Sequence, residues 1–122
     1  MRMADEYRVV VADDEPRFIE LFHTLLDGAE DIRIVGEACN GTEALKLAKE
    51  LLPDGMIIDL YMPDMNGLDV IRQIKAQLPT IRTVLVSSYW DRAYERLAAV
   101  EGDAAFIPKA RLSTQTLLEA LR

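Results

Sequence analysis

The sequence predicts an α/β domain in which five parallel strands form one doubly wound sheet, with helices on both faces. Five short apolar runs rich in β-branched residues alternate along the chain with five segments whose apolar residues recur at helical spacing. The chain has 122 residues, of which 50% are hydrophobic. This length and composition suit one domain with a continuous buried core.

The first half of the chain is predicted to contain two strands and two helices. Residues 7–12 form a β-branched run that is typical of a strand buried on both faces. A helix follows from Pro16 to Gly28, since proline favours the first helical turn and glycine favours a helix end. The second strand covers residues 32–36, and Asn40 then caps a second helix. The predicted apolar stripe of this helix contains Ala44, Leu45, Ala48 and Leu51.

The second half repeats the pattern with three strands and three helices. The predicted strands cover residues 56–60, 83–87 and 104–107. Pro79 and Gly102 end the third and fourth helices, and Ser113 caps the fifth. The apolar residues that mark these helices are Val70, Ile71, Ile74 and Leu78, then Ala93, Leu97 and Val100, then Leu117, Leu118 and Leu121. We expect residues 7–122 to form the domain and residues 1–6 to be an N-terminal extension.

The charge balance excludes some partners. Fourteen lysines and arginines oppose 21 acidic residues, which gives a formal net charge of -7. This balance disfavours non-specific binding to nucleic acids or to anionic membranes, and it suits a protein that binds a hard cation or a basic partner. Cys39 is the only cysteine, so the chain cannot form an internal disulfide. No apolar run approaches the length of a membrane span, and we expect a cytoplasmic protein.

Polar side chains follow or end four of the predicted strands, and they define the candidate site. They are Asp13, Asp14, Asp59, Ser87 and Lys109. Because the carboxyl ends of parallel strands meet at one edge of a sheet, we expect these side chains to share one crevice. A single acid at a strand end is usually a helix cap or a solvated turn residue, but five complementary positions are much harder to obtain by accident.

The chemistry of these residue types points to phosphoryl transfer. Three clustered carboxylates repel one another unless a cation joins them, and Mg²⁺ prefers oxygen ligands, often together with a phosphate oxygen. Aspartate can act as a nucleophile towards phosphorus and form an aspartyl phosphate. A metal ion, an ammonium group and a hydroxyl around one carboxylate would stabilise the charge of the transferred group.

Four segments of the chain resemble the receiver domain of response regulators in two-component signalling. They are residues 11–16, 57–67, 86–88 and 106–109, and the resemblance runs from Tyr7 to the last residue. It implies the flavodoxin-like fold with strand order 2-1-3-4-5, which agrees with the predicted alternation of strands and helices. It also implies a phosphorylation switch that catalyses only its own phosphorylation and dephosphorylation.

The resemblance assigns a role to each candidate residue. Asp59 matches the phosphoacceptor. Asp13 and Asp14 match the acidic pair that holds Mg²⁺, Asp14 directly and Asp13 partly through water. The backbone carbonyl of Tyr61 falls where the family supplies a further ligand. Lys109 matches the lysine that pairs with a phosphoryl oxygen.

The remaining roles concern the switch and its partners. Ser87 matches the hydroxyl that turns inward after phosphorylation, and Phe106 matches the aromatic residue that changes rotamer with it. The implied partners are a sensor histidine kinase and a second copy of the chain in a phosphorylation-dependent homodimer. Nucleic acid is expected only through an output domain outside this sequence.

One segment narrows the class of receiver. Residues 34–45, together with Ala110 where many receivers have proline, resemble receivers that are attached to LuxR-type helix-turn-helix output domains. The chain is then either the receiver of a transcription factor or a stand-alone regulator, and the sequence leaves both open.

Other interpretations compete with these assignments. A phosphohydrolase of the haloacid dehalogenase type would need an acid two residues after the nucleophile, where this chain has Tyr61. A receiver that only docks to partners is disfavoured because all five site positions are filled. Ser87 could instead cap the next helix, and Phe106 could be an ordinary core residue. His23, the only histidine, is expected to be a partly exposed helix residue.

Overall fold

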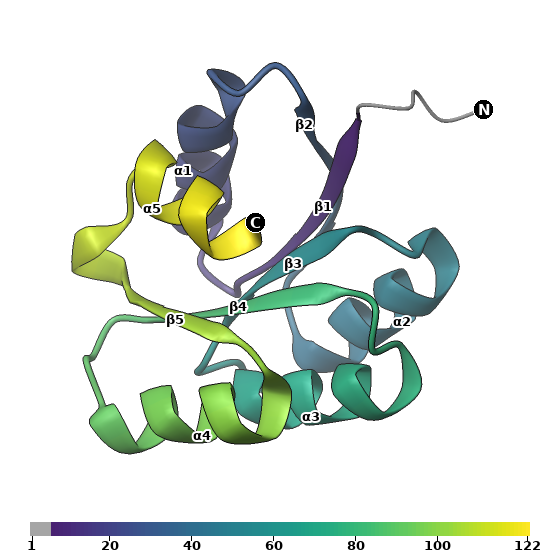
Figure 1. The fold of residues 1–122 in the computed structure, drawn as a ribbon, viewed down its shortest axis with the longest axis vertical. Helices are drawn as coiled ribbons and strands as arrows, with labels where there is room; N and C mark the ends of the chain where they lie inside the picture. Colours follow the sequence, from purple (N-terminus) through teal and green to yellow (C-terminus); the bar gives the residue numbers. More distant parts are fainter. Residues whose placement is uncertain (1–5) are drawn as a thin grey trace.

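The computed structural model describes residues 6–122, and it contains the predicted sheet. All five strands are parallel and their order is β2-β1-β3-β4-β5 (Figure 1). The strands are β1 (Tyr7–Ala12), β2 (Ile32–Ala38), β3 (Gly55–Asp59), β4 (Arg82–Ser87) and β5 (Ala105–Pro108). The helices are α1 (Pro16–Asp27), α2 (Gly41–Leu51), α3 (Gly67–Gln77), α4 (Arg92–Gly102) and α5 (Thr114–Leu121), with a 3₁₀ turn, η1, at Lys109–Arg111.

The doubly wound α/β fold is therefore confirmed, and most boundaries agree with the prediction to within a residue. β2 runs two residues further than predicted because Glu37 and Ala38 continue the pairing with Val11 and Ala12 of β1. The predicted N-terminal extension lies outside the described residues apart from Glu6. No helix among residues 6–122 is long and apolar enough to cross a membrane.

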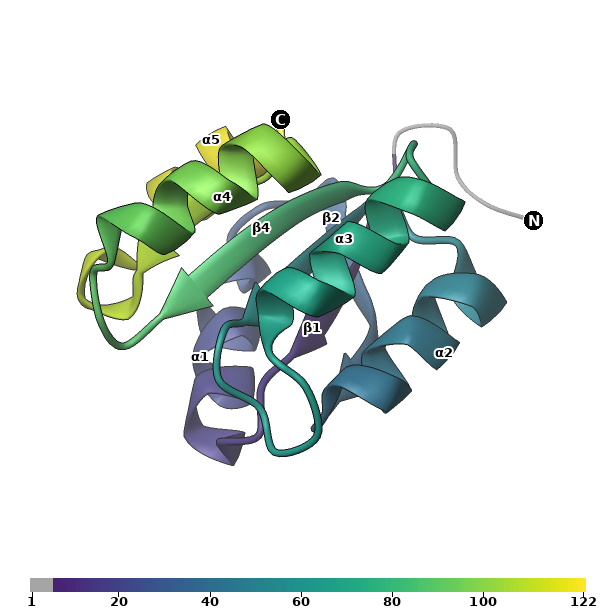
Figure 2. The ribbon, with the colours of Figure 1, turned by 90° about the horizontal axis from the view of Figure 1, so that it is seen from below.

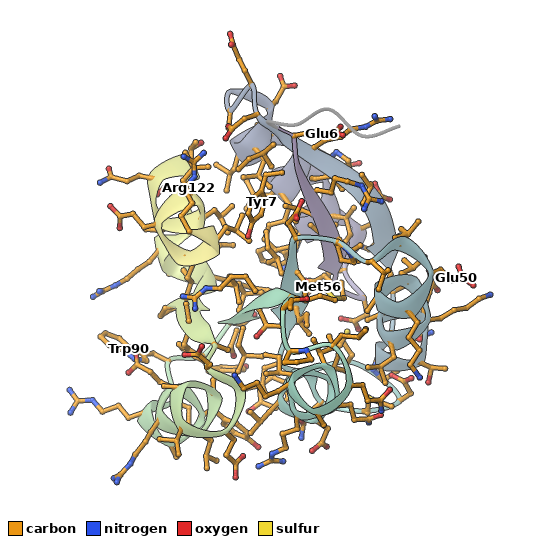
Figure 3. All side chains as sticks on the ribbon, turned by 45° about the vertical axis from the view of Figure 1, so that its right-hand side comes forward. Glu6, Tyr7, Glu50, Met56, Trp90 and Arg122 are labelled. Atoms are coloured by element: carbon orange, nitrogen blue, oxygen red, sulfur yellow. The ribbon has the colours of Figure 1, made fainter. Side chains whose placement is uncertain are left out.

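The sheet separates two hydrophobic layers. Helices α2, α3 and α4 cover one face and α1 and α5 cover the other (Figures 1 and 2). Alternate residues of the central strands point into opposite layers, so Met56 and Ile58 of β3 pack towards α2–α4 while Ile57 packs towards α1 and α5. Each of these side chains is fully buried, and Figure 3 shows Met56 in the interior of the molecule. This two-sided burial holds the carboxyl ends of the strands in fixed positions.

Helix α4 differs from the prediction in the face that it buries. The helix forms where expected, but Val100 is 75% exposed and Leu97 is 36% exposed. The buried residues are the small ones, Ala98 and Gly102. A Cβ atom at Gly102 would overlap the side chain of Ile71 on α3, so close approach to α3 selects the small face of α4 rather than its larger apolar residues.

Candidate functional site

The carboxyl ends of four strands bring the predicted site residues together at one edge of the sheet. Asp13 directly follows β1, Asp59 is the last residue of β3, Ser87 is the last residue of β4, and Lys109 directly follows β5. All four side chains are buried. Only Asp14 is exposed among the five residues that the sequence singled out.

Lys109 joins the two buried carboxylates. Its ammonium nitrogen lies 2.8 Å from Oδ2 of Asp13 and 3.3 Å from Oδ1 of Asp59. The three side chains are at most 5% exposed, so water screens their charges weakly. Lys109 is therefore not an ordinary solvent-exposed lysine.

Burial perturbs both carboxyl groups. Desolvation raises the pKa of Asp59 to about 6; the neighbouring Asp13 carboxylate adds to this shift, and the Lys109 ammonium opposes it. Desolvation also raises the pKa of Asp13, against the hydrogen bonding and charge of Lys109. One ammonium group therefore compensates the two carboxylates incompletely, and a further cation would favour their ionised forms.

The acidic residues offer oxygen ligands to such a cation. Carboxylate oxygens of Asp13, Asp14 and Asp59 lie within 4.8 Å of one another. Asp13 accepts a hydrogen bond through Oδ1 from the backbone N–H of Glu15 at 2.9 Å, whereas its buried Oδ2 faces the Lys109 ammonium at 2.8 Å and no other hydrogen-bond donor among residues 6–122. A cluster of three carboxylates beside a single ammonium group fits a hard divalent cation such as Mg²⁺.

The same Asp13 contact shapes the entry to α1. The Glu15 N–H that Asp13 accepts belongs to the N-cap residue of α1, whose own side chain makes no capping hydrogen bond. Pro16 then occupies the start of the helix, where its missing N–H carries no cost. Asp13 thus orders the turn before α1 and also faces Lys109.

The loop between β3 and α3 carries Tyr61, and Asp64 ties this loop to another helix. The Asp64 carboxylate accepts hydrogen bonds from the backbone N–H groups of Gly41 and Thr42 and from the Thr42 hydroxyl, at 2.6 to 2.8 Å. These bonds hold the pKa of Asp64 well below its usual range, with the Thr42 hydroxyl as the largest cause. This role could not be predicted from the sequence, because the partners precede Asp64 by more than twenty residues and the segment has the composition of an ordinary turn.

Gly67 closes the same loop. Its N–H donates to the Leu60 carbonyl at 2.7 Å, and a Cβ atom at this position would overlap the backbone carbonyl oxygen of Asp59. The φ angle of Gly67 is not positive. Glycine is therefore required here by close approach to the strand end that carries Asp59, rather than by turn conformation alone.

Ser87 and Phe106 lie on neighbouring strands. The Ser87 hydroxyl oxygen accepts a hydrogen bond from the backbone N–H of Tyr89 at 3.2 Å, and the cap of α4 is Asp91. The alternative in which Ser87 caps α4 is therefore wrong. Phe106 pairs in register with Leu85 and is half-buried against the layer that contains α4.

Three tyrosines form an aromatic rim beside the β3–α3 loop, which directly follows Asp59. The Tyr61 ring makes edge-to-face contacts with Tyr89, at 6.4 Å between centroids, and with Tyr94, at 6.5 Å. These contacts connect the β3–α3 loop to α4 and to the segment before it. Tyr61 and Tyr89 are 50% and 70% exposed, so the aromatic rim is open to solvent. Trp90, which follows Tyr89 in the sequence, is exposed as well (Figure 3).

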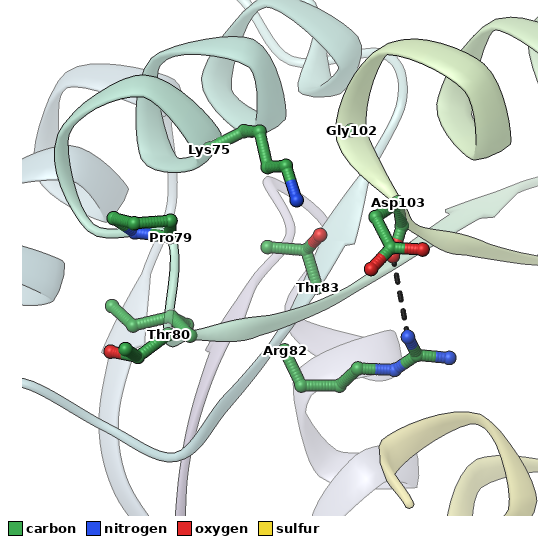
Figure 4. Close-up of a pocket in the computed structure, with 8 residues that line it drawn as sticks. Lys75, Pro79, Thr80, Arg82, Thr83, Gly102 and Asp103 are labelled. Atoms are coloured by element: carbon green, nitrogen blue, oxygen red, sulfur yellow. Dashed lines mark hydrogen bonds between the residues drawn. The ribbon is translucent and has the colours of Figure 1, made fainter.

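Two further polar features involve residues other than the five predicted for the site. His23 is an exposed residue of α1, as expected, and its Nε2 lies 2.5 Å from a Glu37 carboxylate oxygen. A pocket of about 170 Å³ opens between the ends of α3 and α4 and the start of β4 (Figure 4). There Arg82 donates hydrogen bonds to the carbonyls of Asp103 and Ala120 at 3.3 and 2.9 Å. This arginine joins three elements at the opposite end of β4 from Ser87.

Comparisons with known protein families and solved structures identify the family to which this fold belongs. The fold is that of a signalling receiver domain. Residues 9–122 match the sequence profile of the response regulator receiver domain, and the chain belongs to that family.

The relatives fall into two groups. The chain is 36% identical over 118 residues to the probable transcriptional regulatory protein NarL of Mycobacterium tuberculosis, covering 96% of this chain and 54% of that protein. It is 37% identical over 103 residues to a protein-glutamate methylesterase/protein-glutamine glutaminase of Alkalilimnicola ehrlichii, covering 84% of this chain and 26% of that protein. The chain thus spans about half, or less, of the length of these curated relatives.

Solved structures show the same division. The signal receiver domain of NarL from M. tuberculosis superposes with a TM-score of 0.86 at 32% identity, covering 95% of this chain and 96% of that domain. The response regulator domain of CheB from Thermotoga maritima has a TM-score of 0.86 at 31% identity, covering 96% and 94%. The predicted flavodoxin-like strand order is thereby confirmed.

Proposed function

We propose that this receiver domain accepts a phosphoryl group on Asp59 in a Mg²⁺-dependent reaction, and that the donor is the phosphohistidine of a sensor histidine kinase. The observation that supports this proposal best is the burial of Asp59 beside Lys109 and Asp13 at the end of β3. A pKa of about 6 leaves Asp59 mainly ionised at neutral pH, which a nucleophilic carboxylate requires.

The reaction transfers one phosphoryl group between two nucleophiles. A carboxylate oxygen of Asp59 forms a bond to phosphorus while the bond between phosphorus and the donor's imidazole nitrogen breaks, and the electron pair stays on that nitrogen. Asp13, Asp14, Asp59 and the backbone carbonyl of Tyr61 would hold Mg²⁺, which would supply positive charge to the phosphoryl oxygens. Lys109 adds a second cation that is already beside the acceptor.

The phosphorylated aspartate then acts as a switch. It carries roughly -1.5 to -2 charge if it resembles other phosphorylated side chains, and it lies two strands from β5. We assign the response to Lys109, to the buried Ser87 hydroxyl and to the half-buried Phe106. These residues border α4, β5 and α5, whose outer surface would change its affinity for a partner such as a second copy of the chain.

The output that suits the sequence best is a LuxR-type DNA-binding domain. Support comes from NarL, a probable transcriptional regulatory protein of which this chain spans 54%. A cytoplasmic location is part of this proposal. A stand-alone regulator is the alternative, and the likeness to a methylesterase receiver at 37% identity favours an enzymatic output as a third.

Intact mass spectrometry after incubation with acetyl phosphate tests the proposed chemistry. The wild type should gain one phosphoryl group with Mg²⁺ and none with a chelator, and Asp59→Asn should gain none in either buffer. A wild type that gains no phosphoryl group, and that also fails to respond to beryllium fluoride with Mg²⁺, contradicts the proposal and favours a docking module.

A further inference from the structure

The Lys109 ammonium group has a third close neighbour that the proposed chemistry does not use. Its nitrogen lies 3.7 Å from the centroid of the Phe18 ring on α1, well inside the distance at which a cation is attracted to an aromatic face. The Lys109 side chain is only 5% exposed. The ring therefore takes the place that water would occupy beside a solvated ammonium group.

The start of α1 fixes the ring in this position. Phe18 lies in the first helical turn, and its N–H donates to the Glu15 carbonyl at 3.0 Å. The Asp13 carboxylate orders the Glu15 backbone at 2.9 Å, so the same acid that pairs with Lys109 also orients the turn that carries Phe18. The ring also packs against the buried residues between the sheet and α1 and α5.

The chemistry of a ring face suits this position. An ammonium group has three N–H donors, and Asp13 and Asp59 account for two acidic partners. Glu15 is more distant at 3.9 Å and pairs with Arg17 at 3.0 Å. A third close carboxylate would compete with the incoming phosphoryl oxygens for the Lys109 ammonium group. An aliphatic side chain would leave the desolvated cation without compensation. The aromatic face attracts the cation and carries no net charge.

On the basis of the proposed function, we infer that Phe18 is a positioning residue for phosphorylation, which holds the Lys109 ammonium at Asp59 through a cation–π contact. Phe18 touches neither the phosphoryl donor nor the acceptor in this role. It acts through Lys109, and its effect on the reaction should vanish when the ammonium group is absent.

The test compares phosphorylation rates with acetyl phosphate at saturating Mg²⁺. Phe18→Leu keeps an apolar side chain but has no ring face, and it should slow phosphorylation by about 3- to 30-fold, from the usual strength of cation–π contacts. Phe18→Tyr should stay close to the wild type. Phenylalanine analogues with one, two and three ring fluorines at position 18 should slow the reaction stepwise, because each fluorine withdraws electron density from the ring face.

Two controls separate positioning from packing. Phe22→Leu makes the same change one turn along α1, where the ring is fully buried and no cation of residues 6–122 lies over it. Its melting temperature should fall while its phosphorylation rate, measured well below that temperature, stays unchanged. In a Lys109→Met background, Phe18→Leu should have no further effect on the rate.

The outcomes distinguish this inference from the proposed function. If the wild type is phosphorylated, and Phe18→Leu and the ring-fluorinated variants react at the same rate as the wild type, only the role of Phe18 is overturned. A full effect of Phe18→Leu in the Lys109→Met background also overturns it. A wild type that takes no phosphoryl group contradicts the proposed function, and the role of Phe18 with it.

Discussion

Lys109 lies closer to Asp13 than to Asp59. Its ammonium nitrogen is 2.8 Å from the Asp13 carboxylate and 3.3 Å from that of Asp59, the residue that we assign as the phosphoacceptor. The lysine is thus held beside the acceptor mainly by another acid. This arrangement leaves the ammonium group free to strengthen its contact on the Asp59 side when negatively charged phosphoryl oxygens arrive there.

Loss of this cation should be most damaging when no metal is bound. Lys109→Ala leaves Asp13 and Asp59 buried without an ammonium partner, and breaking a buried pair costs about 3 kcal/mol of unfolding free energy. Mg²⁺ should recover part of this loss, because it supplies charge to the same oxygens. Urea unfolding in chelator and in Mg²⁺ measures both values, and an equal loss in the two buffers would contradict the shared site. The variant should also respond more weakly to phosphorylation.

The elevated pKa of Asp59 predicts how stability depends on pH. Its value of about 6 lies above the ordinary 3.8, so between these pH values the folded state binds more protons than the unfolded state. The free energy of unfolding of the metal-free wild type should therefore fall as pH rises from about 4 to 6 and remain lower above pH 6.

Asp59→Asn removes the titrating group and should escape this loss. The variant should be more stable than the metal-free wild type by up to about 3 kcal/mol at pH 7, with little difference at pH 4. Thermal unfolding at a series of pH values in chelator measures this. A variant that melts below the wild type at pH 7 would show that Asp59 is not destabilised by its surroundings.

Substitution of a proposed Mg²⁺ ligand should weaken Mg²⁺ binding while it leaves the free energy of unfolding almost unchanged. Asp14 is exposed, so Asp14→Asn should change the free energy of unfolding by less than about 0.5 kcal/mol while weakening Mg²⁺ binding on the order of tenfold or more. Glu20 is an exposed acid that lines the same groove as Asp14. Calorimetric titration of Glu20→Gln should give the wild-type affinity, and equal weakening in both variants would indicate a diffuse charge effect instead of a ligand.

The Asp64 contacts should govern the loop that carries Tyr61. Asp64→Asn loses a charged acceptor for the N–H groups that begin α2, and the melting temperature should fall by a few degrees. Phosphorylation by acetyl phosphate should slow as well, because the Tyr61 carbonyl is then less firmly placed. Asp69→Asn, an acid that pairs only with the partly exposed Arg72 among its described ion-pair partners, is the matched control, and an equal rate effect there would exclude a specific anchor.

Much of the fold was predictable because local patterns determine it. The β-branched runs and the helix caps Asn40 and Ser113 fall where the structure has strands and helix starts. The exposed stripe of α4 could not be predicted, since close packing of Gly102 against Ile71 outweighs the burial of Leu97 and Val100, and that contact depends on a partner helix.

The candidate site, likewise, was predictable from the sequence in part only. Strand ends brought Asp13, Asp59 and Lys109 together as the topology required. The roles of Asp64 and Phe18 escaped prediction because each depends on a partner far along the chain. Phe18 in particular fits the apolar stripe of α1, and only the position of the Lys109 ammonium, 3.7 Å from the ring centroid, distinguishes its ring from ordinary core.

In the proposed reaction the side chain of Asp59 carries the phosphoryl group, and reductive trapping can locate that group on the chain. Borohydride reduces an aspartyl phosphate to homoserine and leaves free carboxylates unchanged, so peptide mass spectrometry can locate the modified residue. After treatment with acetyl phosphate and Mg²⁺, homoserine should be found at position 59. Homoserine at position 13 or 14 instead, or at no position in a protein that has gained a phosphoryl group, would show that Asp59 is not the phosphoacceptor.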